Sequence, residues 1–147
     1  DIMSFGGTKN GLMLGEAILI FNSELRKNAA FYQKQSMQLY SKNRFIAAQF
    51  IAFLSNNLWL QLALHSNQMA QMMAEKLQTI PEIKITQPVQ TNSIFVIIPE
   101  KIIEPLREKY KFYTWNEQTN ELRWMCSFDT IEKEIDDFVE TIRQLVE

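Results

Sequence analysis

The sequence has 147 residues, the size of one domain, and its 46% hydrophobic and 22% charged residues are ordinary for a soluble globular protein. A net charge of −2 argues against nucleic acid as the main partner, and polar residues interrupt every long apolar stretch, which argues against a membrane-spanning helix. The single cysteine, Cys126, excludes an internal disulfide and a cysteine-rich zinc site, so we expect a cytoplasmic protein without a metal centre.

A glycine-lined lysine turn stands near the start of the chain. Residues 4–11 read Ser-Phe-Gly-Gly-Thr-Lys-Asn-Gly and lie between the apolar pair Ile2-Met3 and an apolar run over 16–21. This pattern predicts two strands joined by a tight turn that carries Lys9. Glycine allows a close approach that a Cβ would forbid, so a bulky group can lie against the turn. Three interpretations of Lys9 are open: its amine binds a phosphate group, its amine attacks a carbonyl group and traps it covalently, or Lys9 is an ordinary exposed turn residue.

The position of the first predicted strand indicates whether the chain is part of a longer protein. A strand starts almost at residue 1, and no initiator methionine or earlier element precedes it. A buried strand needs neighbours and a helical cover. We therefore expect the chain to be the C-terminal part of a longer protein.

The middle of the chain is rich in good helix formers and free of proline and glycine from Glu24 to Gln78. Asn22-Ser23 is a suitable N-cap before this stretch, and Asn56-Asn57 marks a break within it. The pattern predicts three helices, over 24–41, 43–55 and 57–78.

Past Pro81 the pattern changes to strands and shorter helices. The predicted elements are strands over 83–85 and 93–98, a helix to about 110, strands over 111–115 and 121–127, and a closing helix. The closing helix is expected to begin at a capping box over Asp129–Glu132. The order strand, helix, strand, strand, helix predicts a small α/β sandwich with helices on one face of a mainly antiparallel sheet.

Four segments, in order along the chain, carry a resemblance to a known family. They are the Ser4–Gly11 string with the Glu-Ala and apolar strand after it, Lys42–Phe50, Asn57–Leu60, and the arginine strand Leu122–Asp129. Together they resemble the L-threonine aldolase branch of the β-eliminating lyase family, whose members are fold-type I enzymes that use pyridoxal 5'-phosphate. The resemblance runs through the whole chain.

This resemblance implies a domain organisation and four site residues. Residues 1–55 correspond to the end of the cofactor-binding large domain plus interdomain helices, and residues 56–147 to the small C-terminal α/β domain. Lys9 occupies the position that forms a Schiff base with the cofactor aldehyde, and Thr8 lies close to the position of the cofactor phosphate. Arg44 matches a position near the cofactor phosphate or the carboxylate region. Arg123 matches the arginine that binds the substrate carboxylate. From the residues alone, Arg123 is instead a strand arginine paired with Glu121 or Asp129.

The other reactive side chains have structural interpretations. His65 lies mid-helix and is expected on a helix surface or at an interface, Cys126 is expected to be inert in a strand, and the tryptophans are expected in a core or interface. By resemblance, the histidine, the ring-stacking residue and the carboxylate partner of the pyridine nitrogen precede Lys9, outside this chain.

The resulting hypothesis is a lyase of amino-acid metabolism that cleaves a β-hydroxy amino acid to glycine and an aldehyde. The resemblance also implies a homo-oligomer with active sites shared between subunits, and the 147-residue chain by itself is expected to be inactive. The alternatives are another pyridoxal-phosphate lyase that catalyses β-elimination, and a non-catalytic α/β dimerisation module.

Overall fold

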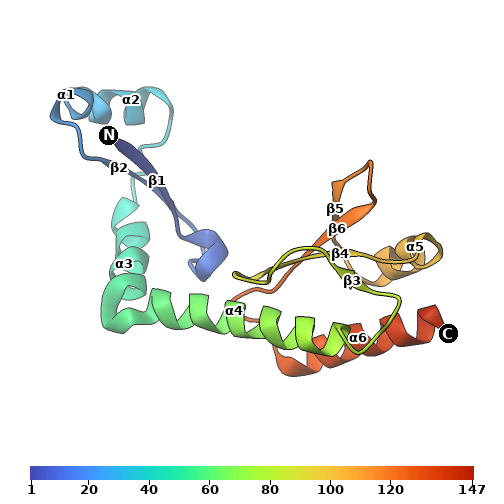
Figure 1. Ribbon diagram of the computed structural model, residues 1–147. Coiled ribbons are helices and arrows are strands. Elements are labelled where there is room, and N and C mark those ends of the chain that lie inside the picture. The colour runs from blue at the N-terminus through green and yellow to red at the C-terminus, as the bar shows by residue number, and fades with distance from the viewer. The chain divides into compact units, whose positions relative to one another are not determined.

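The computed structural model describes all residues from Asp1 to Glu147 and has a mixed α/β architecture, which confirms the predicted fold class (Figure 1). The chain divides into two compact units, Asp1–Leu62 and Ala63–Glu147. This division falls inside helix α4 (Leu58–Leu77). The domain boundary predicted after residue 55 concerns the domains of a longer protein and stays a prediction.

The first unit is built from a two-stranded hairpin and short helices. Its elements in chain order are β1 (Ile2–Gly6), the 3-10 turn η1 (Thr8–Asn10), β2 (Glu16–Ile20), α1 (Ser23–Arg26), α2 (Ala29–Gln35), α3 (Asn43–Leu54), the 3-10 turn η2 (Ser55–Asn57) and the start of α4. The two predicted strands are confirmed, and they pair antiparallel with Ile2 opposite Ile20 and Gly6 opposite Glu16. The lysine turn is therefore the loop of a hairpin.

The long helix predicted over 24–41 is wrong in its extent. Asn22 caps the start as expected, because its Oδ1 accepts hydrogen bonds from Glu24 N at 2.9 Å and Leu25 N at 3.4 Å. The helix then breaks before Asn28, whose φ of −112° and ψ of 10° are not helical, and chain reversal follows at Met37 with φ 57°. Asparagine competes for backbone hydrogen bonds, so good helix formers around it do not guarantee one continuous helix.

Helix α3 lies against the hairpin through a small part of its apolar face. The side chains of Ile46 and Phe50 lie next to Gly15, and the rings of Phe5 and Phe50 are 6.0 Å apart. Gln49 fixes the loop between the strands, since its Oε1 accepts hydrogen bonds from the Met13 and Leu14 amides at 3.1 and 3.3 Å. The hairpin loop thus has a defined position on α3.

Substituting Gly15 by alanine should destabilise this contact. Gly15 has φ of +131°, which side chains rarely adopt, and an added Cβ would lie 2.7 Å from Ile46 Cγ2. Backbone strain and overpacking together predict a loss of about 2–4 kcal/mol in the free energy of unfolding. Urea unfolding of Gly15→Ala, with hydrogen exchange of the hairpin amides, measures this loss. In the matched control Gly6→Ala the new Cβ meets only the movable Glu16 carboxylate, so equal losses in the two variants would contradict the prediction.

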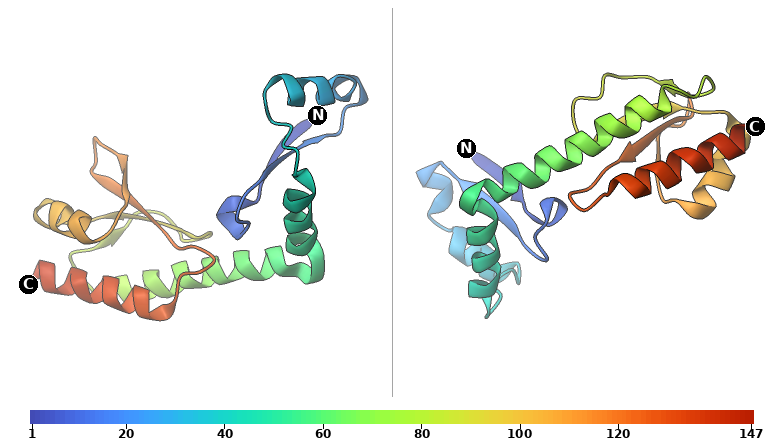
Figure 2. Two further views of the ribbon diagram at one scale, coloured as in Figure 1. Left: turned by 180° about the vertical axis from the view of Figure 1, so that it is seen from behind. Right: turned by 90° about the horizontal axis from the view of Figure 1, so that it is seen from below.

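The second unit is a four-stranded antiparallel sheet with helices packed on it. Its elements are the rest of α4, β3 (Lys84–Ile85), β4 (Ser93–Ile97), α5 (Glu100–Lys109), β5 (Tyr113–Asn116), β6 (Glu121–Met125) and α6 (Glu132–Val146). The strand order is β3-β4-β6-β5, and every neighbouring pair is antiparallel. Figures 1 and 2 show α6 beside the C-terminal part of α4, with both helices on the same side of the sheet. The predicted sandwich with helical cover on one face is confirmed.

The hydrophobic core of this unit lies between that face of the sheet and the helices. Alternate residues of the central strands point into it, so Ile94 and Val96 of β4 and Leu122 and Trp124 of β6 are buried while their neighbours are not. The residues that pack against them from the helices are Met69, Ala70, Met73, Ala74, Leu77, Ile102, Ile103, Leu106, Ile135, Phe138, Val139 and Ile142. One face of the sheet is thereby closed, and the side chains between the buried ones project from the other face.

The start of the closing helix differs from the prediction. Asp129 is not the N-cap, because α6 begins at Glu132 and Ile131 precedes it with extended backbone. Glu134 instead accepts a hydrogen bond from the Ile131 amide at 3.0 Å, and Thr130 Oγ1 accepts one from Ser127 N at 2.8 Å. Thr130 thus closes the turn before the helix, and Glu134 caps a helix that starts later than predicted.

The helical run Asn43–Leu77 is long and apolar enough to cross a membrane by length and composition, contrary to the expectation that no such segment exists. The run is not one straight helix, however. Asn56 and Asn57 have φ of 52° and 56°, which confirms the predicted break between α3 and α4. The C-terminal part of α4 contributes Ala70, Ala74 and Leu77 to the core, which is the role of a helix in a globular domain.

Candidate functional site

The lysine turn presents Lys9 on a fixed backbone. Residues 8–10 form a 3-10 turn that ends at Gly11 with φ of 111°, a left-handed conformation that favours glycine. Asn10 Nδ2 donates to the carbonyl of Trp59 at 3.0 Å, which ties the turn to the start of α4. The Lys9 side chain is exposed, and its amine makes no ion pair or hydrogen bond. The amine is therefore free to react, while its backbone is held.

The two glycines before the turn, Gly6 and Gly7, leave little room for a side chain of their own. A Cβ on Gly6 would lie 2.5 Å from Glu16 Oε2, and a Cβ on Gly7 would lie 2.8 Å from Leu12 Cδ2. The space that these glycines leave is thus taken by side chains of the hairpin itself. The glycines therefore allow the hairpin loop to fold back on itself.

Thr8 and Arg44 are both exposed in the first unit. Thr8 Oγ1 donates a long hydrogen bond of 3.4 Å to the carbonyl of Gly15, across the hairpin loop. Arg44 lies in the first turn of α3, with its guanidinium 5.1 Å from the Phe45 ring centre and without an ion-pair partner. Arg44 retains its guanidinium donors for a phosphate group, whereas the one O–H of Thr8 is used by the Gly15 carbonyl. The structure records no contact between the two side chains.

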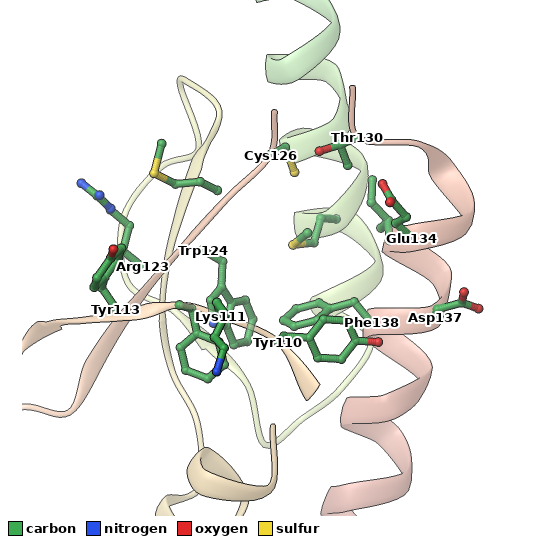
Figure 3. Close-up of a pocket in the computed structure, with 14 residues that line it drawn as sticks. Tyr110, Lys111, Tyr113, Arg123, Trp124, Cys126, Thr130, Glu134, Asp137 and Phe138 are labelled. Carbon is green, nitrogen blue, oxygen red and sulfur yellow. The ribbon is translucent and has the colours of Figure 1, made fainter. Parts of the chain in front are cut away.

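Arg123 projects from the open face of the sheet in the second unit. It lies on β6 between the buried Leu122 and Trp124, opposite Phe95 of β4 and Tyr113 of β5. Figure 3 shows the side chains of Arg123 and Tyr113 on the side of β6 away from α6, whereas Trp124 points towards α6. This placement follows from strand alternation.

The guanidinium of Arg123 has no acidic partner. Glu121 accepts hydrogen bonds from Thr86 Oγ1 and Gln87 instead, and Asp129 makes no ion pair with it. Nε of Arg123 is buried and has no hydrogen-bond partner. The alternative in which Arg123 pairs with Glu121 or Asp129 is therefore wrong. A buried donor without an acceptor is costly, so an acceptor from outside the described chain is chemically favoured here.

A pocket of about 410 Å³ lies beside β6 in the same unit (Figure 3). Its floor is aromatic, since the Trp124 ring packs edge-on against Phe138 at 4.8 Å and Phe112 at 6.0 Å. Trp124 Nε1 is buried without an acceptor. The lining residues are Met73, Tyr110, Lys111, Phe112, Tyr113, Arg123, Trp124, Met125, Cys126, Thr130, Glu134, Ile135, Asp137 and Phe138.

His65 and Cys126 have structural roles. His65 Nε2 hydrogen-bonds the carbonyl of Thr130 at 2.7 Å and thereby joins α4 to the segment before α6. Cys126 is 2% exposed, and burial raises the pKa of its thiol to about 11. A thiol with so high a pKa is almost wholly protonated at neutral pH and a poor nucleophile, as expected.

One neighbour of Arg123 was not singled out by the sequence. Trp115 was interpreted only as a core or interface residue, but its side chain is 54% exposed and its ring centre lies 5.1 Å from Arg123 Cζ. Tyr113 pairs directly with Arg123, but the register of β5 on β6 shifts between Thr114 and Asn116, so Trp115 lies at this irregularity. Strand alternation in the sequence therefore does not predict the contact of Trp115 with Arg123.

Comparison with known proteins shows which proteins this chain is similar to. No protein-family model matches the chain. A curated low specificity L-threonine aldolase of a Pseudomonas species is 38% identical over 147 residues, and one from Pseudomonas aeruginosa is 39% identical over 144 residues. These alignments cover 99% and 97% of this chain. The chain spans only about two-fifths of these relatives, 42% and 41% of their lengths.

The solved structures agree with the curated sequences. A threonine aldolase from Leishmania major matches all of this chain with a TM-score of 0.86 and 33% identity, over 44% of its own length. The chain is thus a homologue of the low specificity L-threonine aldolases and corresponds to their C-terminal part, which confirms the resemblance inferred from the sequence.

Proposed function

We propose that the full-length protein containing this chain is a pyridoxal-phosphate-dependent lyase that cleaves a β-hydroxy amino acid to glycine and an aldehyde. The similarity to low specificity L-threonine aldolases over almost the whole chain carries this proposal. Two features of the structure support it: a free lysine amine on a fixed turn and an arginine without an acidic partner. Reactions of amino acids on this cofactor need an amine that holds the cofactor and a cation that binds the substrate carboxylate.

Lys9 is the residue that would hold the cofactor covalently, through its Nζ. The hairpin and the hydrogen bond from Asn10 fix the backbone of this residue, while no acidic side chain binds the amine. Thr8 and Arg44 would bind the cofactor phosphate. Arg44 has free guanidinium donors for it, and the Thr8 hydroxyl would exchange its long hydrogen bond to the Gly15 carbonyl for one to the phosphate. Bound pyridoxal phosphate would supply an aromatic ring that accepts electrons when a bond to the substrate Cα breaks.

Arg123 would bind the substrate carboxylate through its planar fork of N–H donors. Such a fork fixes the orientation of the carboxylate as well as its charge, and so fixes which bond of the substrate Cα is cleaved. Lys9 Nζ is also an amine that could hold a proton near the substrate. His65 is assigned no part in the reaction, because its Nε2 is used by the Thr130 carbonyl.

The rest of the active site lies outside this chain in the proposed protein. We expect the groups that stack on the cofactor ring and bind its pyridine nitrogen to come from the other part of the sequence, and the 147-residue chain alone to be inactive. The protein is proposed to be a cytoplasmic homo-oligomer with active sites shared between subunits, without nucleic acid or membrane as a partner.

Substrate preference tests the proposed function. The full-length protein with pyridoxal phosphate is assayed for aldehyde and glycine from L-threonine, L-allo-threonine and phenylserine, with L-tryptophan and L-tyrosine as matched substrates that lack the β-hydroxyl. Cleavage restricted to the three β-hydroxy substrates is expected, because only they give an aldehyde when the Cα–Cβ bond breaks. Ammonia and pyruvate from tryptophan or tyrosine would instead show a β-eliminating lyase, and no turnover of any substrate would favour the non-catalytic module.

A further inference from the structure

Trp115 contacts Arg123 on the open face of the sheet. The two residues lie on adjacent antiparallel strands, and the guanidinium carbon is 5.1 Å from the Trp115 ring centre. Trp115 is half exposed and Tyr113, two residues earlier, is 76% exposed, so neither ring is used to fill the core. The indole of Trp115 therefore packs against Arg123 and not into the hydrophobic core.

Phe95 supports Trp115 from the other side of β6. Its ring contacts Trp115 edge-on, with centres 5.3 Å apart. Phe95 and Trp115 belong to β4 and β5, which are separated by β6 in the sheet and hence by about 9.5 Å between strand axes. Rings that meet across this distance must lean towards each other over the Arg123 stem. This arrangement explains why Arg123 Nε is buried although the residue projects from an open face.

The contact with Trp115 restricts the motion of the Arg123 guanidinium. A free arginine side chain has about 2 kcal/mol of rotamer entropy to lose when it binds a ligand. An aromatic face against the guanidinium favours one plane of the group by about 0.5–1 kcal/mol or more, and leaves its N–H donors pointing outwards in that plane. Part of the ordering that carboxylate binding requires is thus already present in the protein.

We propose that Trp115, supported by Phe95, is a positioning residue that holds the Arg123 guanidinium in the plane needed for two-point binding of the substrate carboxylate. This inference rests on the proposed function of Arg123. Trp115 itself does not touch the reacting atoms. Its effect should therefore pass entirely through Arg123.

The test is a double-mutant cycle in the full-length protein with L-threonine as substrate. Trp115→Leu is expected to lower kcat/KM about tenfold, mainly by raising KM, while Trp115→Phe keeps an aromatic face and stays within about threefold of wild type. In an Arg123→Met background, Trp115→Leu should change kcat/KM less than twofold. A merely structural role would give the same factor in both backgrounds.

Matched controls separate the possible failures. Tyr113→Leu removes another exposed aromatic ring from the same face and is expected to change kcat/KM less than twofold. A loss as large as that of Trp115→Leu would overturn the assignment to Trp115. A tenfold effect of Trp115→Leu that persists in the Arg123→Met background would overturn the positioning role and leave the Arg123 assignment standing. An Arg123→Met variant with wild-type KM would overturn the role of Arg123 in the proposed function, and the inference with it.

Discussion

Replacing Lys9 by alanine should lower kcat of the full-length protein by roughly 10³-fold or more, because no other group on the hairpin turn can hold the cofactor covalently. The same loss is expected for Lys9→Arg. An arginine keeps the positive charge and the exposed position, but its guanidinium stays protonated and does not condense with an aldehyde. This pair of variants separates a covalent role of Lys9 from a role as a phosphate ligand.

Chemical trapping gives the second measurement for Lys9. Borohydride reduction followed by peptide mass spectrometry should place a pyridoxyl group on the peptide that contains Lys9, and neither Lys9 variant should carry it there. Lys34→Ala is the matched control, because Lys34 is another exposed lysine of the same unit without an ion pair. It should keep both the adduct and the activity. A pyridoxyl group on a different lysine, or near-normal turnover by Lys9→Arg, would refute the covalent assignment.

The second large effect is expected at Arg123. Arg123→Met removes two charge-assisted hydrogen bonds to the substrate carboxylate, which predicts a loss of about 3 kcal/mol, or roughly 100-fold in kcat/KM. Arg123→Lys retains the charge without the planar fork and should lie between Arg123→Met and wild type. The loss should be similar for every β-hydroxy substrate that the protein cleaves, because the carboxylate is the part that they share.

Two further readouts make the Arg123 result specific. Borohydride trapping on Lys9 should survive in Arg123→Met, since Arg123 is assigned to the substrate and not to the cofactor. Arg143→Met is the matched control: Arg143 on α6 bonds Thr79 at 3.0 Å and pairs weakly with Glu140 at 3.8 Å, and its loss should change kcat/KM less than twofold. If Arg143→Met and Arg123→Met had equal effects, Arg123 would be an ordinary surface arginine.

Local patterns predicted much of the fold because they depend on neighbouring residues. The β-branched and apolar composition of 93–98 and the position of 121–127 after a polar turn indicated both central strands, and the structure has them as β4 and β6. The predictions failed where the same local sequence pattern is compatible with more than one backbone structure. Asn28 interrupts a stretch of helix formers, and Asp129 precedes a polar turn rather than capping α6.

The sequence by itself determined that Lys9 lies on a tight turn between two strands, that Arg123 lies on a strand, and that the chain resembles the threonine aldolases. Only the tertiary structure decided what surrounds these groups. Gly6 and Gly7 receive the hairpin's own side chains, and Arg123 lies under Trp115 without an acidic partner. Contacts of this kind depend on strand register and on the packing of rings from non-adjacent strands, and residues distant in the sequence meet only once that register is formed.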